Sequence, residues 1–443
     1  MRRMTTLFVL QGICACVTVG GLFGAAGTVV GAELQASVAR VDITPPLDMH
    51  CPLGGYGERM NRPAEGVHDR VFAKALVVSD GSKRFVIITA DVLGFPPPVK
   101  PALVKLLADD GWTAEQIMLL ASHSHTSIEM NAINPANTFQ VPQIGIHNPR
   151  VYDFLLERLV QVVRDANLAL VPVEVGTSSV AIEGWNRNRR GRGAVDNELT
   201  VTRVDTTDGK PLAVLVNFTA HPTFMSAEDM LFSGGWPGHM QRTLESLIGQ
   251  GVTAMYFNGA EGDQSPIGRA DAGDSHWERA ERYGRDLGIV AWQQWQDTTA
   301  EEDPALAYHA HTIALPRRTW HPDFKKTGGA EYGLSEDLLE AMLPRMFPDK
   351  IDSVSVRLGD LLIVGVPGEM AASLGLKIKS EAGRTTGAKH PVIGGLADAW
   401  ISYMLPADEY RRGGYESSVS FYGETLGDTV VAGALAGVAE MPR

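Results

Sequence analysis

The chain has 443 residues, with 39 Lys and Arg side chains against 52 Asp and Glu and a formal net charge of −13. This acidic balance argues against nucleic acid as a partner, because binding to a phosphate backbone relies on basic side chains. Beyond the first 32 residues only Cys51 remains of the three cysteines. That part of the sequence therefore has no internal disulfide framework and no thiolate metal cluster.

The N-terminal residues have the pattern of an export signal. Two arginines precede an apolar run over residues 7–30, and small residues end that run. We expect a signal peptide over residues 1–32, cleaved before Glu33, and an exported protein with a periplasmic or secreted location. Two alternatives remain open. The run is long enough to anchor an uncleaved chain in a membrane, and Cys14 or Cys16 forms a weak lipoprotein-type site.

The rest of the chain alternates apolar runs with helical patterns and shows neither an internal repeat nor a low-complexity linker. The expected strands cover residues 85–90, 117–121, 213–219, 253–257 and 361–366. The expected helices cover residues 150–166, 238–248, 277–295 and 370–381. This pattern predicts an α/β fold in which mixed β-sheets flanked by helices form one large domain over residues 33–443.

A polar segment follows each of these five predicted strands. The segments are Asp91, residues 122–125, His221, residues 258–265 and Glu369. In α/β sheets, ligands gather beyond the carboxyl ends of strands, where the loops can converge. We therefore expect an active site at these strand ends. The alternative is that polar residues only mark where each strand leaves the core.

The pair His123 and His125 is the clearest local signal for a metal or catalytic site. In an extended segment, residues i and i+2 project from the same face, so both imidazoles can point into one pocket. One can bind a metal while the other moves protons or polarises a carbonyl. His221 would add a further ligand, since zinc takes imidazole and carboxylate groups. The alternatives are solvated histidines at a strand end and, for His221, a structural hydrogen bond.

Glu369 and Ser265 each allow two interpretations. Glu369 lies at a predicted strand-to-helix junction, where it can bind a metal or act as a first-turn carboxylate favoured by the helix dipole. Ser265 precedes Pro266, which fits a helix N-cap with proline at the first helical position. The other interpretation places Ser265 against substrate as a nucleophile or a hydrogen-bond donor.

Taken together, these motifs resemble the catalytic domain of neutral/alkaline ceramidases. Ser-His-Ser-His-Thr at 122–126 resembles the family's Thr-His-Thr-His-Ser, and Gly-Asp-Gln-Ser-Pro at 262–266 resembles Gly-Asp-Val-Ser-Pro. Val-Pro-Gly-Glu at 366–369 is similar to the same stretch of the family, and Tyr403 falls where the family has a tyrosine. Further matches lie at 41–45, 54–57 and 217–223. The motifs follow the family order over nearly the whole chain beyond residue 35.

The resemblance implies a function and a set of site residues. It implies hydrolysis of the amide bond of ceramide or a related N-acyl lipid by an enzyme with one Zn²⁺ per chain. The implied zinc ligands are His123, His221, Glu369 and Tyr403. The implied catalytic residues are His125, beside the substrate, and Ser265, near the attacked carbonyl. A lipid substrate would also bring transient contact with a membrane surface.

The identity of the nucleophile is open between Ser265 and water. We favour metal-activated water, because bound zinc lowers the pKa of water and polarises the carbonyl. A serine nucleophile would need an adjacent base that holds no metal, and His125 is the candidate for that role.

Several departures from the family lie around the expected substrate. Ile267 stands where the family has Asn, residues 128–130 replace a glycine-rich turn, and residues 235–237 replace a polar stretch. We also expect the chain to lack the C-terminal immunoglobulin-like domain of full-length members. The alternative functions are a zinc hydrolase of another small amide, peptide or ester, and a non-catalytic protein of the same fold.

Overall fold

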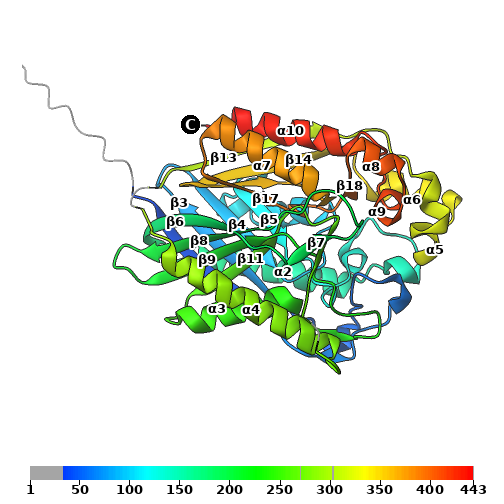
Figure 1. Ribbon diagram of the computed structural model, residues 1–443, viewed down its shortest axis with the longest axis horizontal. Helices are drawn as coiled ribbons and strands as arrows, with labels where there is room; N and C mark the ends of the chain where they lie inside the picture. Colours follow the sequence, from blue (N-terminus) through cyan, green and yellow to red (C-terminus); the bar gives the residue numbers. More distant parts are fainter. Residues whose placement is uncertain (1–32, 270, 302–303, 443) are drawn as a thin grey trace, which may run out of the picture. The chain divides into compact units, whose positions relative to one another are not determined.

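Two β-sheets packed face to face between helices form the core of the protein (Figure 1). The computed structural model describes residues 33–269, 271–301 and 304–442, and these belong to one compact unit. The expected signal peptide lies outside the described residues. Within the described part of the chain, no helix has both the length and the apolar composition needed to cross a membrane.

The larger sheet has eight strands in the order β11-β9-β8-β6-β1-β3-β4-β5. In chain order these are β1 (Gln35–Asp42), β3 (Phe72–Ser79), β4 (Arg84–Ala90), β5 (Ile117–Ala121), β6 (Val171–Ala181), β8 (Glu198–Thr206), β9 (Pro211–Phe218) and β11 (Thr253–Asn258). Neighbours are antiparallel in the middle of the sheet, whereas the pairs β4–β5 and β9–β11 at its two ends are parallel.

The smaller sheet has four strands in the order β13-β14-β15-β17. They are β13 (Leu306–Ala314), β14 (Lys350–Leu358), β15 (Leu361–Gly365) and β17 (His390–Gly394). Only the pair β15–β17 is parallel in this sheet. Both sheets are therefore mixed, as the sequence predicts.

Burial of both sheet faces explains the unbroken apolar runs of the sequence. In β4, Phe85 and Ile87 pack into the core between the two sheets. Their neighbours Val86 and Ile88 point the other way and join the core beneath the helices. A strand that is covered on both faces has no solvated side and therefore no polar alternation.

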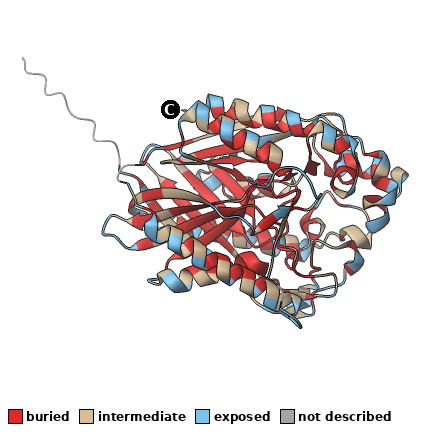
Figure 2. Ribbon diagram, in the orientation of Figure 1, coloured by how far each residue is buried: buried red, intermediate tan, exposed pale blue. Residues whose placement is uncertain are grey.

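Helices cover the outer faces of both sheets. Against the larger sheet pack α1 (Val99–Leu106), α2 (Pro149–Ala166), α3 (Gly235–Ile248) and α4 (His276–Asp297). Against the smaller sheet pack α7 (Ala372–Thr386) and α10 (Leu426–Glu440). Figure 2 shows that most of the sheet residues are buried, while the helices expose their outward faces. In α2 the buried residues Val151, Leu155, Leu159 and Val162 recur at the spacing of one helix face.

The mixed α/β fold class is confirmed, and each of the nine expected strands and helices corresponds to an observed element. Sequence reasoning missed β1, β3, β6, β8, β13, β14 and β17, together with α1 and α10. It also missed α6 (Glu336–Met346), which proves important for the site. The short elements that position site residues are β7 (Asn186–Asn188), β12 (Gln264–Pro266), β16 (Glu369–Met370) and β18 (Tyr403–Met404).

Candidate metal and active site

His123 and His125 follow β5, but the backbone between them is not extended as expected. The strand ends at Ala121, and His123 adopts a left-handed conformation with φ of 66°. Its N–H donates to the carbonyl of Val92 (3.1 Å), which fixes the chain in this bend. The two imidazoles still converge, with ring centroids 4.9 Å apart. The expectation of proximity was right, but the expected cause, an alternating strand, was wrong.

The ring of His123 is fixed by its backbone contact. Its Nδ1 lies 2.6 Å from the carbonyl oxygen of Leu93. A carbonyl only accepts, so Nδ1 carries the proton and Nε2 is left with a free lone pair. This Nε2 faces an oxygen of Glu369 at 3.5 Å and the Nε2 of His125 at 3.3 Å.

His221 repeats this arrangement from the opposite end of the large sheet. It follows β9, and its Nδ1 donates to the carbonyl of Glu261 at 2.7 Å. Its Nε2 lies 3.0 Å from the same oxygen, Oε2, of Glu369. The imidazole centroids of His123 and His221 are 4.8 Å apart. Two lone pairs therefore point at one carboxylate oxygen.

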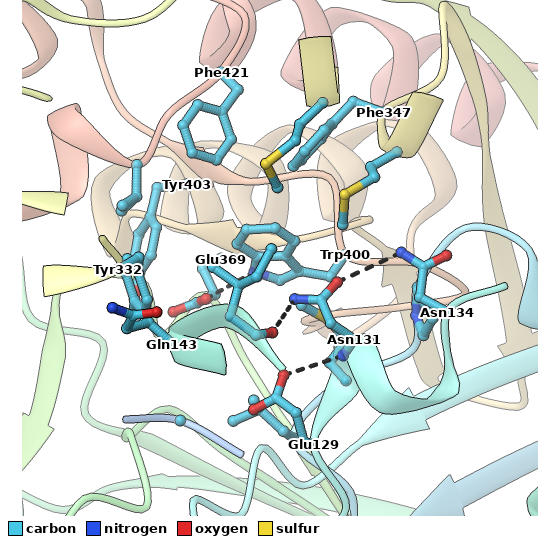
Figure 3. Close-up of a pocket in the computed structure, with 18 of the residues that line it drawn as sticks. Glu129, Asn131, Asn134, Gln143, Tyr332, Phe347, Glu369, Trp400, Tyr403 and Phe421 are labelled. Atoms are coloured by element: carbon cyan, nitrogen blue, oxygen red, sulfur yellow. Dashed lines mark hydrogen bonds between the residues drawn. The ribbon is translucent and has the colours of Figure 1, made fainter. Parts of the chain in front are cut away.

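Glu369 and Tyr403 are brought together by two short parallel strands. Glu369 of β16 pairs in register with Tyr403 of β18. This close approach requires a glycine at 368, because a Cβ there would lie 2.5 Å from the carbonyl oxygen of Ser402. The indole N–H of Trp400 donates to the second oxygen of Glu369 at 2.8 Å (Figure 3). Oε2 of Glu369 is thereby the one left facing the histidines.

The electrostatics favour neutral forms of His221 and His125 and the ionised form of Glu369. Burial, followed by the positive charge of Arg189, lowers the pKa of His221 to about 4. Burial likewise lowers the pKa of His125. Burial acts to raise the pKa of Glu369, but the facing imidazoles outweigh it and hold that pKa well below the ordinary value. Neutral imidazoles beside a carboxylate are the protonation states that a divalent cation needs.

Tyr403 is the fourth predicted ligand and lies beside this cluster. Burial, followed by the charge of Glu369, raises the pKa of its phenol. The guanidinium of Arg189 donates to its hydroxyl at 3.1 Å and also pairs with Glu416 at 2.8 Å. Sequence reasoning did not identify Arg189 as a site residue.

The donor set fits a metal ion such as zinc. Nε2 of His123, Nε2 of His221 and Oε2 of Glu369 are all acceptors, and acceptors in contact repel unless a cation or a proton lies between them. Nδ1 of each imidazole donates a hydrogen bond to a backbone carbonyl. Metal-binding histidines usually make such a bond through the ring nitrogen that does not bind the metal. Ligand atoms of His123, His125 and His221 lie within 4.8 Å of one another. His125 is therefore close enough to be a neighbour of the metal or a ligand itself.

Sequence reasoning missed Glu261 as a member of this cluster. It lies in the glycine-containing loop after β11, and it offers a ligand atom within 4.8 Å of those of His123 and Glu369. The signal that could have identified it is the one used for the other residues, a polar side chain directly after a buried strand.

Two predicted residues lie apart from the cluster. Asp91 accepts from the backbone N–H of Phe72 (3.0 Å) and the side chain of Gln241 (3.2 Å), so it has a structural role. Ser265 belongs to β12, which pairs with β7, and it is not among the residues that line the cavity. The helix-cap interpretation of Ser265 is wrong, because the next helix, α4, begins at His276 and is capped by Ser275.

A cavity opens beside the cluster and is lined by His123, His125, Glu369 and Tyr403. Most of its wall is apolar. That wall comes largely from α6 and from the segment between residues 400 and 421, through Leu334, Leu339, Met342, Met346, Phe347, Trp400, Val419 and Phe421. A polar side is formed by Glu129, Asn131, Asn134 and Gln143. Figure 3 shows Glu129 and Asn131 opposite Phe347 and Phe421 across this space.

His125 is positioned at this cavity by its neighbours. Position 55 must be a glycine there, because a Cβ would lie 2.3 Å from Nδ1 of His125. Tyr56 packs edge-on against the His125 ring at 5.2 Å between centroids. Nδ1 of His125 is buried without a hydrogen-bond partner among the described residues. Because Nδ1 lies against Gly55, Nε2 is the ring atom of His125 that faces the cluster.

Comparisons with known proteins agree with this fold. Residues 35–275, more than half of the chain, match the family described as neutral/alkaline non-lysosomal ceramidase, N-terminal. A neutral ceramidase from Mycobacterium tuberculosis is 23% identical over 84% of this chain and 72% of its own length. A neutral ceramidase from Pseudomonas aeruginosa is 20% identical over 83% of this chain and 66% of its own length. Neutral ceramidase B of Dictyostelium discoideum is 26% identical, but the match covers only 33% of that protein.

Solved structures show the same fold. The crystal structure of the neutral ceramidase from Pseudomonas aeruginosa aligns with a TM-score of 0.77 at 17% identity, covering 92% of this chain and 74% of that one. A structure described as ceramidase complexed with C2 aligns with the same TM-score at 18% identity, covering 92% of this chain and 75% of that one. The fold and the matched sequence define a hydrolase. The chain belongs to the neutral/alkaline non-lysosomal ceramidase family.

Proposed function

We propose that this protein hydrolyses the amide bond of an N-acyl lipid, ceramide or a close relative, at a single zinc ion. The ligands in this proposal are His123, His221, Glu369 and Tyr403. The observation that carries the proposal is a cluster of bare nitrogen and oxygen acceptors on the wall of a largely apolar cavity. The cluster suits a metal, and the cavity suits a hydrocarbon chain.

Zinc, when bound, supplies a Lewis acid that polarises the amide carbonyl and lowers the pKa of a water nucleophile. The chain's own residues supply the rest. The carbonyls of Leu93 and Glu261 fix the imidazole tautomers of His123 and His221, and Trp400 orients the Glu369 carboxylate. These contacts keep the ligand atoms in place before substrate arrives.

His125 is suited to proton transfer or to hydrogen bonding at the reacting carbonyl. Its ring lines the cavity, and its pKa is lowered by burial. A neutral imidazole can donate to a developing oxyanion or pass a proton to the leaving amine. The position of Ser265 away from the cavity wall supports water over serine as the nucleophile.

A second candidate is hydrolysis of a smaller, more polar amide, peptide or ester at the same centre. The polar side of the cavity favours it. Glu129 approaches from a segment where the sequence departs from the family's glycine-rich turn, and Gln143 adds an amide. These groups would recognise hydroxyl or amide N–H groups, which ceramide-like lipids also carry.

The test is metal analysis of purified protein combined with hydrolysis assays. An N-acyl sphingosine and a short N-acyl amine would be compared before and after chelation and after zinc is restored. We expect zinc-dependent release of fatty acid with a preference for the long-chain lipid. Turnover of only the short amide would support the second candidate. A protein that binds zinc yet hydrolyses neither would match a non-catalytic member of the fold.

We also propose that the protein is exported after cleavage of residues 1–32. The arginines and the apolar run at the N-terminus support this proposal. N-terminal sequencing of the protein from its native host should begin at Glu33. A chain that keeps Met1 in the membrane fraction would instead indicate an anchor.

A further inference from the structure

Glu261 is a buried carboxyl group that lacks the partners such a group normally has. Glu261 is 0% exposed, and neither oxygen of its side chain forms a hydrogen bond within the described part of the chain. Buried polar groups are almost always hydrogen-bonded. Removing a charged group from water without a partner costs several kcal/mol of lost hydration. The other acidic groups near the centre follow that rule. Glu369 accepts from Trp400, and Glu416 pairs with Arg189.

The position of Glu261 points to the metal centre. One of its oxygens lies within 4.8 Å of ligand atoms of both His123 and Glu369. Its backbone carbonyl accepts from Nδ1 of His221, and the next residue, Gly262, donates its N–H to Met370 at 2.8 Å. The loop is therefore joined to the segments that carry the other predicted ligands.

Glu261 contributes to the cluster without lining the cavity. It is not among the residues that line the cavity, whereas His123, His125 and Glu369 are. A general base must reach the substrate or a water molecule beside it, so this position does not suit a base. A metal ligand can lie wholly on the protein side of the ion.

Two carboxylates this close to each other repel unless a cation lies between them or one of them holds a proton. A proton would turn Glu261 into a hydroxyl donor, but no hydrogen bond joins either oxygen to another described residue. A divalent cation removes both difficulties. With Glu261 and Glu369, its two charges are balanced without requiring a phenolate from Tyr403.

We propose that Glu261 is a further ligand of the metal centre, bound from its buried side together with His123 and Glu369. This inference rests on the proposed zinc centre and adds a second carboxylate to it. It also explains why the loop after β11 brings a glutamate to a fully buried place, where a small apolar residue would otherwise be favoured.

The test compares zinc affinity, by competition with a chromogenic chelator, in wild type, Glu261→Gln and the control Glu129→Gln. Glu129 is also a carboxyl group near the site, but it lies on the cavity wall. All proteins would carry His309→Ala and His311→Ala, because these surface histidines flank Glu440 and could take up zinc themselves. We expect Glu261→Gln to bind zinc about 10–100-fold more weakly, and Glu129→Gln to match wild type.

Two further readouts separate a ligand from a structural residue. The metal-free Glu261→Gln protein should melt at the same temperature as metal-free wild type or higher, because an unpaired carboxyl is gone. The visible spectrum of the Co²⁺-substituted protein should change in Glu261→Gln and not in Glu129→Gln. If Glu261→Gln does not fold, a zinc-bound crystal structure of wild type should show a Glu261 oxygen about 2.0–2.2 Å from the ion.

The failures are distinguishable. If wild type takes up no zinc, the proposed function is overturned, and this inference with it. If wild type binds zinc while Glu261→Gln has the same affinity and the same Co²⁺ spectrum, or the crystal structure shows Glu261 away from the ion, the inference alone is overturned.

Discussion

Two buried polar regions of this protein differ in how their charges are balanced. In the first turn of α1, the ammonium group of Lys100 lies 2.8 Å from a carboxylate oxygen of Asp398. The other oxygen of Asp398 accepts from the N–H of Leu119 at 2.9 Å. In the centre around His123, lone pairs and carboxylate oxygens face one another, and no ammonium or guanidinium group pairs with Glu369 among the described residues. The first region is complete within the chain, whereas the second, in our proposal, is completed by a metal cation.

This difference distinguishes a buried ion pair that stabilises the fold from a buried cluster that can bind a ligand. Both regions are almost inaccessible, with Asp398 and Glu369 each 4% exposed, so burial alone does not distinguish them. The distinguishing feature is the missing positive partner. The predictions below test whether the two regions respond to mutation in these different ways.

The largest expected effect on stability is at the paired region. Lys100→Met leaves the Asp398 carboxylate buried without its cation and should cost about 3–5 kcal/mol of unfolding free energy. Urea unfolding measures this, and metal content should be unchanged. The double variant Lys100→Met/Asp398→Asn should regain part of the loss. An equal or larger loss in the double variant would show that the ion pair is not the cause.

At the centre, His125→Ala should leave stability and zinc content nearly unchanged but lower kcat on the order of 10²-fold or more. The reason is that His125 lines the cavity and its Nε2 faces the cluster. Steady-state kinetics and metal analysis on the same sample check this. Loss of zinc in this variant would make His125 a ligand, which its distance to His123 also allows.

How much of this site the sequence predicts depends on the kind of signal each residue leaves. His123, His221, Glu369 and Tyr403 lie in motifs whose order resembles the family, and the structure brings them together. Glu261 stands among glycines and resembles part of a turn. Its role depends on neighbours that are more than 100 positions away in sequence.

The strands of the fold also differ in how strong a signal they leave in the sequence. Strands such as β4 and β5 are unbroken apolar runs because both faces are buried, and these were predicted. Strands β6 and β8 carry Thr, Ser and charged residues on partly exposed faces, so their composition gives a weaker signal. The bend at His123 could not be predicted, because histidine tolerates left-handed backbone better than most residues but does not require it.

The pH dependence of stability should reveal the state of Glu129. Burial raises its pKa to about 7 from an ordinary value of 4.5. The folded protein therefore holds this proton over a range in which the unfolded chain has released it, and stability falls as pH rises through that range. Glu129→Gln removes this term, so its stability relative to wild type should rise by about 1–3 kcal/mol between about pH 4.5 and 7.5. Urea unfolding at several pH values measures the difference, and parallel curves would contradict it.

The smallest effect is expected at Ser265. Because Ser265 does not line the cavity and caps no helix, Ser265→Ala should change kcat by only a few-fold and stability by less than about 1 kcal/mol. Rapid-mixing kinetics of wild type should show no burst of amine release. An acyl group trapped on Ser265 during turnover would show instead that serine is the nucleophile.

The most direct test of the central claim is the metal content of the purified protein. Inductively coupled plasma mass spectrometry of protein prepared without chelators should find about one zinc per chain, and His221→Ala should remove it, because the variant lacks one of the proposed ligands. Lys100→Met should keep it. A wild-type protein that contains no zinc and takes up none in titration would contradict the claim that the buried acceptors around His123 form a metal centre.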